Sequence, residues 1–155
     1  MGQEIEKKFL VVSEAWKTQA THCVRYRQGY LCGNEHSSIR VRISDDSAHL
    51  NIKSATLGIE RQEFEYAIPV ADARQLLDTL CIRPLIEKTR HYVPHGDHVW
   101  EVDVFEGDNA GLVVAEVELR HVDDTPLLPD WAGEEVSHDI RYYNTSLVRH
   151  PYKDW

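Results

Sequence analysis

The chain alternates apolar and polar residues with a period of two over most of its length, which predicts about eight β-strands. The alternating segments are residues 4–11, 24–31, 38–44, 49–54, 61–68, 86–93, 99–105 and 113–120. Short stretches rich in Gly, Asn and Asp separate several of them. Because short turns join strands that run in opposite directions, we expect consecutive strands to pair antiparallel.

One stretch departs from this alternation. Between Pro69 and Pro84, apolar residues recur with helical spacing, and they predict an amphipathic helix over 70–80. Residues 126–131 suit a loop, and 141–149 suit a short helix near the end of the chain. At 155 residues the chain has the usual size of one domain. The expected fold class is therefore mainly β (α+β), as a single domain over 1–155.

The polar positions of the strands are charged with unusual regularity. Like charges recur two residues apart, as at Glu4 and Glu6 or at Arg40 and Arg42, so they share one face of a strand. The acidic members of this face are Glu4, Glu6, Glu63, Glu65, Glu101, Asp103, Glu116 and Glu118. The basic members are Lys8, Arg40, Arg42, Lys53, Arg61, Lys88, Arg90 and Arg120.

Two arrangements of the sheet accommodate this face. The charges line the solvated outside of a barrel filled by apolar side chains, or the barrel is closed with its charges inward and its apolar face covered by helices and loops. Charged rows usually face solvent, but clustered like charges cost stability and normally serve a ligand. Basic patches beside paired carboxylates suit a polyphosphate with divalent cations, because guanidinium groups bind phosphoryl oxygens and carboxylates hold Mg²⁺ or Mn²⁺.

Composition excludes some classes of partner. A net charge of -9 argues against a general nucleic-acid binder, which presents a basic face to phosphates. No apolar run approaches the roughly 20 residues that a membrane span needs, and no leader opens the sequence. The three cysteines are odd in number and lack metal-site spacing, so we expect reduced thiols in a cytoplasmic protein.

The opening residues 4–8, Glu-Ile-Glu-Lys-Lys, resemble the Glu-x-Glu-x-Lys signature of the CYTH superfamily, also called triphosphate tunnel metalloenzymes. Further charged motifs appear in that family's order: Arg40 and Arg42, Lys53, 61–65, 87–90, Glu101 and Asp103, and 116–118. The resemblance implies a closed eight-stranded antiparallel tunnel with a charged interior and a few helices outside. It also implies two divalent ions, Mg²⁺ or Mn²⁺, and a small-molecule substrate with a linear triphosphate.

The compact length and the ending 141–147 look most like short bacterial members that hydrolyse inorganic tripolyphosphate to pyrophosphate and phosphate. A Lys often follows the tyrosine of that ending, whereas this chain has Tyr143. Carried over by position, the implied metal ligands are Glu4, Glu6, Glu63, Glu65, Glu116 and Glu118. The implied triphosphate contacts are Lys8, Arg40, Arg42, Lys53, Arg61, Lys88, Arg90 and Arg141. Glu4, Glu6 and Lys8 form the implied catalytic set.

Other readings remain open at this point. A class IV-type adenylate cyclase or a thiamine triphosphatase would use the same architecture. A non-enzymatic module that binds polyphosphate or nucleotide would keep the basic residues but would not need so many clustered acids. Arg120, Asp103 and Glu101 fit a role as ion-pair partners that balance the charge of the interior as well as they fit a functional role. The sequence leaves the physiological triphosphate, the preferred metal and the oligomeric state open, a homodimer included.

Overall fold

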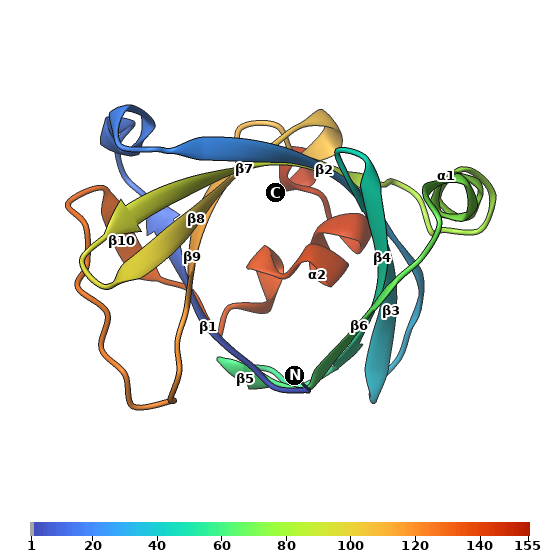
Figure 1. The fold of residues 1–155 in the computed structure, drawn as a ribbon, viewed down its shortest axis with the longest axis horizontal. Helices are drawn as coiled ribbons and strands as arrows, with labels where there is room; N and C mark the ends of the chain where they lie inside the picture. Colours follow the sequence, from blue (N-terminus) through green and yellow to red (C-terminus); the bar gives the residue numbers. More distant parts are fainter. Residues whose placement is uncertain (1) are drawn as a thin grey trace.

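The computed structural model describes residues 2–155 as one antiparallel sheet wrapped into a barrel (Figure 1). The sheet order is β10-β1-β9-β8-β7-β2-β3-β4-β6, with β5 paired to β1. The strands are β1 (Glu4–Val11), β2 (His22–Gly33), β3 (Ser37–Ser44), β4 (Ser47–Ser54), β5 (Glu60–Arg61), β6 (Glu63–Ala67), β7 (Ile86–His95), β8 (His98–Phe105), β9 (Val113–Glu118) and β10 (Ala132–Glu135). The α-helices are α1 (Val70–Thr79) and α2 (Asn144–Arg149). Short 3-10 helices cover Ala15–Thr18, Gly107–Asn109, Ile140–Tyr142 and Tyr152–Asp154.

Strands β5 and β6 complete the barrel wall between β4 and β1. β6 pairs with β4, whereas β5 pairs with β1 through the register Glu4↔Arg61. The backbone N–H of Glu63 donates to the carbonyl of Gly2 at 3.2 Å, and that of Glu6 donates to Ile59 at 2.9 Å. The break between β5 and β6 is one residue long, so the pair acts as one bent strand. The expected antiparallel tunnel is confirmed, although the sheet has nine strands when β5 and β6 are counted as one, instead of the eight that were expected.

The structure differs from the sequence prediction in several elements. β10 was not expected, because four residues that include a glycine and two acids carry no readable alternation. β9 ends at Glu118 instead of at 120, so Arg120 leaves the charged face and its backbone N–H donates to Asp124 Oδ2 at 3.1 Å. The predicted helix over 70–80 is confirmed as α1, and the predicted helix over 141–149 is split into a 3-10 turn and α2.

The charged face points into the barrel, which decides between the two arrangements that the sequence allowed. Lys88 and Asp103 are each 1% exposed, and Arg40 and Glu116 are each 5% exposed. Charged side chains are rarely this buried unless they are paired or hold a ligand. The interior of the barrel is therefore a polar bore and not an apolar core.

The apolar face lies outside the barrel and is covered by elements added to the sheet. On one side Trp100 packs edge-on against Trp131 with their rings 5.6 Å apart, within a cluster that also holds Trp16 and Phe9. On another side α1 places Ala73 and Leu77 against Val41 and Ala48 of β3 and β4. Helical spacing of four residues puts both side chains on one face of α1. These outer layers supply the hydrophobic burial that the bore cannot.

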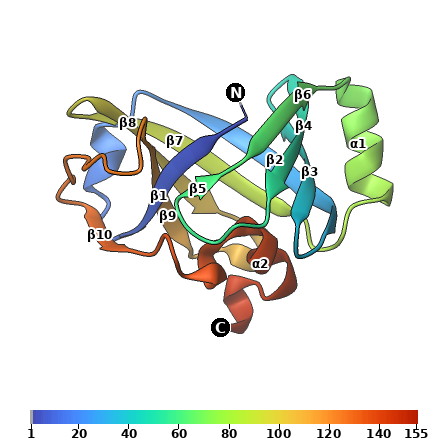
Figure 2. The same cartoon turned by 90° about the horizontal axis from the view of Figure 1, so that it is seen from below.

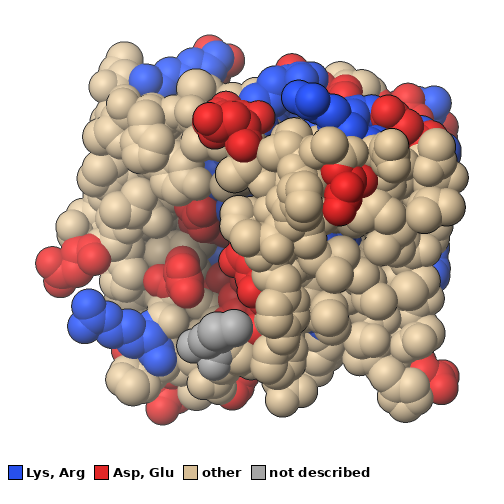
Figure 3. All heavy atoms as spheres, turned by 45° about the vertical axis from the view of Figure 1, so that its right-hand side comes forward, with Lys and Arg blue, Asp and Glu red and all other residues tan. Residues whose placement is uncertain are grey.

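The C-terminal segment closes one end of the bore. Figures 1 and 2 together show α2 and the preceding 3-10 turn lying across that end, with the beginning of β1 toward the other end. Leu147 and Val148 anchor α2 in a cluster with Ile86, Phe105 and other buried residues. Figure 3 shows the other mouth obliquely, as a hollow with acidic side chains gathered along it.

Within residues 2–155 no helix is both long enough and apolar enough to span a bilayer.

Candidate active site

A cavity of about 70 Å³ occupies the bore. Its aromatic lining comes from Tyr30 and Tyr143, and the rest of the lining is polar or charged. The lining residues are Glu4, Glu6, Lys8, Tyr30, Ser38, Arg40, Arg42, Lys53, Arg61, Glu63, Lys88, Arg90, Glu116, Tyr143, Asn144 and Thr145. Eleven of the residues that the sequence nominated for metal or triphosphate binding are in this set, from Glu4 on β1 to Glu116 on β9.

Two guanidinium groups on β3 lack acidic partners. Arg40 Nε donates to Asn51 Oδ1 at 3.4 Å, and Arg42 Nε donates to Gln28 Oε1 at 2.8 Å. Among residues 2–155, no carboxylate lies within ion-pairing distance of either group. Burial, and then the neighbouring charges of Arg40 and Arg90, lower the pKa of Arg42 to about 10. The two side chains therefore present uncompensated positive charge to the cavity.

Lys88 and Arg90 on β7 share the carboxylate of Asp103. Lys88 Nζ lies 2.7 Å from Asp103 Oδ2, and Arg90 contacts both oxygens with Nε at 2.8 Å and Nη2 at 3.0 Å. Burial would raise the pKa of Asp103, but Arg90 and Lys88 outweigh it and lower that pKa. Burial lowers the pKa of Lys88 to about 7 although Asp103 opposes the shift. Asp103 is thus the fixed counter-ion of β7.

Lys8 joins the acids of β1 and β9. Its Nζ lies 2.7 Å from Glu116 Oε1 and 3.5 Å from Glu6 Oε1. Burial would lower the pKa of Lys8, but Glu116 and Glu6 outweigh burial and raise it. In turn, Lys8 and Arg90 outweigh burial at Glu116 and hold its pKa well below the usual value. Lys8 and Glu116 therefore stay charged at neutral pH.

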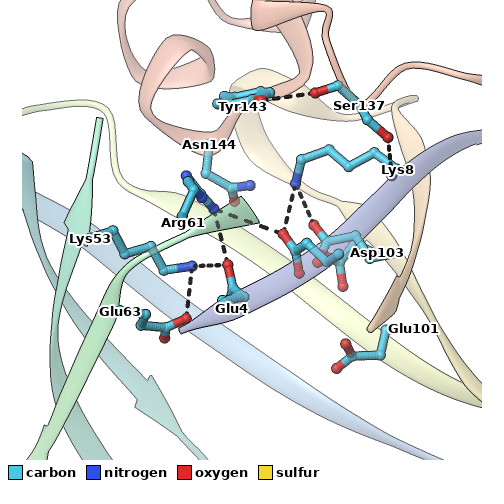
Figure 4. Close-up of polar contacts among 12 residues, drawn as sticks. Glu4, Lys8, Lys53, Arg61, Glu63, Glu101, Asp103, Ser137, Tyr143 and Asn144 are labelled. Carbon is cyan, nitrogen blue, oxygen red and sulfur yellow. Dashed lines mark hydrogen bonds and ion pairs between the residues drawn. The ribbon is translucent and has the colours of Figure 1, made fainter. Parts of the chain in front are cut away.

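A second cluster lies where β5 and β6 meet β1 (Figure 4). Lys53 Nζ lies 3.5 Å from Glu4 and 3.6 Å from Glu63, and Arg61 Nη2 lies 3.3 Å from Glu4 and 3.8 Å from Glu6. Burial, and then the charge of Arg40, lower the pKa of Lys53 to about 8 although Glu4 opposes the shift. Lys53 is therefore a cation whose charge depends on what the bore contains.

The acids of β1 and β9 repel one another. Burial raises the pKa of Glu6, and the charge of Glu116 adds to the shift; burial also raises the pKa of Glu4. Burial, and then Glu4 and Glu6, raise the pKa of Glu118. Glu6 lies opposite Glu118 in the register of the two strands. The bore is thus acidic along β1 and β9, and its unpaired cations lie on β3.

The donor set fits a hard divalent cation. Carboxylate oxygens are the ligands that Mg²⁺ and Mn²⁺ prefer, and mutual repulsion among Glu4, Glu6 and Glu118 is what a cation would relieve. Within residues 2–155, however, no three acidic, His or Cys side chains already converge on one point. Lys8 instead holds Glu6 and Glu116 in ion pairs, and Arg61 holds Glu4 and Glu6. Metal binding therefore requires the carboxylates to exchange a basic partner for the ion.

Three nominated residues do not line the cavity. Glu65 and Glu118 lie on the inward face but at its exposed end, and Glu65 lies 3.7 Å from His49 Nδ1. Arg141 is on the outer surface, where its guanidinium pairs with Asp139 at 2.7 Å and lies over the ring of Trp155. Arg141 is therefore outside the cavity in this structure, and its expected contact with the triphosphate stays a prediction. Arg141 lies within the 3-10 helix Ile140–Tyr142, where its side chain points away from the bore.

Several residues that line the cavity or contact its lining were missed because they carry no charge. Tyr26 lies under Arg42 with 4.2 Å between guanidinium carbon and ring centre, and Gln28 is fully buried beside it. On β2 the charged residues Arg25 and Arg27 point outward, so the alternation that located the other inward faces gave no signal here. Asn144 accepts from Gln28 and Lys88 but belongs to α2, outside any strand pattern.

Comparisons of sequence and of structure with known proteins identify the same family. The sequence model of the CYTH domain family matches residues 2–152. An inorganic triphosphatase from Acetivibrio thermocellus is 46% identical over 155 residues, which are 100% of this chain and 99% of that protein. An inorganic triphosphatase from Nitrosomonas europaea is 37% identical over 150 residues, 94% of this chain and 96% of that protein. The crystal structure of an inorganic triphosphatase gives a TM-score of 0.68 at 34% identity, covering 96% of this chain and 95% of that chain.

The Asp103→Asn substitution should destabilise the barrel by about 3–5 kcal/mol, because it leaves two buried cations without their shared counter-ion. Urea unfolding at neutral pH measures the loss. The matched control is Glu101→Gln, since that carboxylate makes one pair with Arg90, is 21% exposed, and has a pKa raised to about 7 by burial. We expect a cost of about 1–2 kcal/mol there. Equal losses in the two variants would contradict the role of Asp103.

Proposed function

The chain belongs to the CYTH domain family, and from this premise we propose that it hydrolyses inorganic tripolyphosphate to pyrophosphate and phosphate with a divalent cation. The observation that carries the proposal is the pair Arg40, which is buried, and Arg42, which is half-buried; both are hydrogen-bonded to amide oxygens and not to carboxylates. An uncompensated buried charge is costly, so it is retained where a ligand supplies the opposite charge. A linear triphosphate supplies several negative charges in a row.

The shape of the bore supports an inorganic substrate. The cavity is small and closed at one end by Tyr143 and Asn144 of the C-terminal segment. Its lining carries cations from several strands, among them Lys53, Lys88 and Arg42. Guanidinium forks and ammonium groups bind phosphoryl oxygens, whereas the sparse apolar lining offers little to an organic group. Tripolyphosphate alone can make these contacts, so no organic group is needed for binding.

The carboxylates would hold the divalent cation. We assign Glu6 and Glu116 as its main ligands, with Glu4, Glu63 and Glu118 able to complete one or two sites for Mg²⁺ or Mn²⁺. When bound there, such a cation would supply positive charge to the phosphoryl oxygens and to the leaving group. Glu65 is not included in this assignment, because its side chain is half exposed beside His49.

The side chains divide the remaining work between binding and proton transfer. Arg40, Arg42 and Arg90 fix the phosphoryl oxygens, so that the bond to be broken lies in line with the attacking water. Lys8 stays protonated and keeps Glu116 charged. Glu4 has a pKa raised mainly by burial, which suits a carboxylate that orients water and accepts its proton. Catalysis is then positioning and electrostatic stabilisation, with no covalent intermediate.

A substrate panel tests this function. Purified protein is incubated with tripolyphosphate, ATP or thiamine triphosphate, each with Mg²⁺ or Mn²⁺, and the products are separated. Release of pyrophosphate and phosphate from tripolyphosphate is the expected result. Cyclic AMP from ATP would identify an adenylate cyclase, and preferred cleavage of thiamine triphosphate would identify a thiamine triphosphatase. Tight binding of tripolyphosphate without turnover would identify a binding module.

The Glu116→Gln substitution should lower kcat for tripolyphosphate by at least about 100-fold, because it removes a carboxylate from the ion site while keeping the side-chain shape. Phosphate release at saturating metal measures the loss, and circular dichroism checks the fold. Glu106→Gln is the matched control, since that carboxylate pairs with Arg25 outside the bore. Turnover of Glu116→Gln within a few-fold of the control would overturn the assignment.

The pH dependence of binding should depend on Lys53. With a pKa of about 8 in the empty bore, Lys53 loses its proton as pH rises above 8 and must regain it to bind an anion. The affinity for tripolyphosphate, measured without metal, should therefore fall between pH 7 and 9. The fall should be about tenfold larger than in Lys53→Arg, because the arginine stays protonated. Isothermal titration calorimetry measures the affinity of both proteins. Protonation of tripolyphosphate itself affects the two proteins equally. Identical pH profiles would contradict the prediction.

A further inference from the structure

A second cavity adjoins the closed end of the bore. It has a volume of about 300 Å³ and is lined in part by apolar side chains, among them Leu57, Ile82, Ile140 and Val148. Leu57, Ile82 and Ile140 are 53%, 44% and 59% exposed, so this side pocket opens to solvent. It is larger than the cavity in the bore and differs from it in chemistry.

Five residues line both cavities and form their boundary: Tyr30, Ser38, Arg61, Tyr143 and Thr145. Tyr143 faces the bore cations, with its ring centre 5.6 Å from both Lys8 Nζ and the guanidinium carbon of Arg61. It also lines the side pocket together with Ile140 and Val148 of the same C-terminal segment. The ring therefore lies between a charged compartment and a partly apolar one.

Tyr143 is held firmly in this position. Its hydroxyl donates to the carbonyl of Ser137 at 2.8 Å and accepts from the backbone N–H of Gly58 at 2.8 Å. Gly58 and Ser137 belong to separate loops. The hydroxyl of Ser137 also accepts a hydrogen bond from the backbone N–H of Lys8 at 3.0 Å. The residue is 8% exposed. A ring tied at its far end to two loops cannot swing aside as a free side chain does.

We propose that Tyr143 is a specificity-determining residue that closes the bore against the side pocket and so restricts the enzyme to triphosphates without a bulky organic group. This inference rests on the proposed function, since it names which triphosphates the same bore admits. If the ring is absent, the two cavities join, and a terminal phosphate that carries a nucleoside can place the nucleoside against the apolar side chains of the pocket. Steric exclusion by one ring then accounts for the choice of substrate.

The test compares tripolyphosphate with ATP. The wild-type protein should have a kcat/KM at least 100-fold higher for tripolyphosphate. Tyr143→Ala should lower that ratio at least tenfold by raising kcat/KM for ATP, whereas Tyr143→Phe, the matched control, keeps the ring and should keep the ratio. If Tyr143→Ala does not fold, Tyr143→Val shortens the side chain with less loss of packing. An unchanged ratio in the shortened variant, or no preference in the wild-type protein, would overturn the proposal.

A second substitution separates steric opening from general loosening of the site. Ile82 is partly exposed and lines the side pocket but not the bore, so Ile82→Trp fills the pocket. Added to Tyr143→Ala, it should restore the wild-type ratio, and a double variant that still accepts ATP would contradict the steric explanation. Calorimetric titration without metal gives the same comparison from affinities alone. Absence of turnover in every variant would reject the proposed hydrolysis, while the measured affinities for ATP and tripolyphosphate would still decide the role of Tyr143.

Discussion

Enclosing ionised side chains in a protein interior is the constraint on which this structure depends. A buried charge is stable only when an opposite charge and hydrogen bonds compensate it. Asp103 does this for Lys88 and Arg90 with three contacts of 3.0 Å or less, and Glu116 does it for Lys8. These pairs keep the bore open and polar, so the protein must find its hydrophobic stabilisation elsewhere. It does so on the outside of the barrel, where tryptophans and α1 cover the apolar face.

Some charges of the bore lack an opposite charge, and their positions indicate the ligand. Arg40 and Arg42 have amide oxygens as partners where Arg90 has three carboxylates. On the opposite strands, carboxylates crowd one another and their pKa values rise. Unpaired cations on one wall and crowded acids on the other match a polyphosphate bound together with a divalent cation. The same electrostatics that would destabilise an empty bore provide binding energy for its ligand.

The sequence predicted the fold and most of the lining because one rule, alternation with charge on a single face, holds on nearly every strand. It failed where that rule is absent. β10 is too short to alternate, Gln28 and Tyr26 are uncharged, and Arg25 and Arg27 mark the outward face of β2 instead of the inward one. The C-terminal segment was the hardest part. Whether Arg141 or Tyr143 faces the bore depends on a 3-10 turn directly before α2, and no periodicity encodes that turn.

The central claim is that the charged bore is where the triphosphate binds. A crystal structure with tripolyphosphate and Mn²⁺, using anomalous scattering to locate the metal, tests it most directly. The phosphate chain should lie against Arg40 and Arg42, with the Mn²⁺ signal beside Glu6 and Glu116 and with the ion pair of Lys8 and Glu116 rearranged. Tripolyphosphate bound on the outer surface, with the ion pairs of the bore unchanged, would contradict the claim.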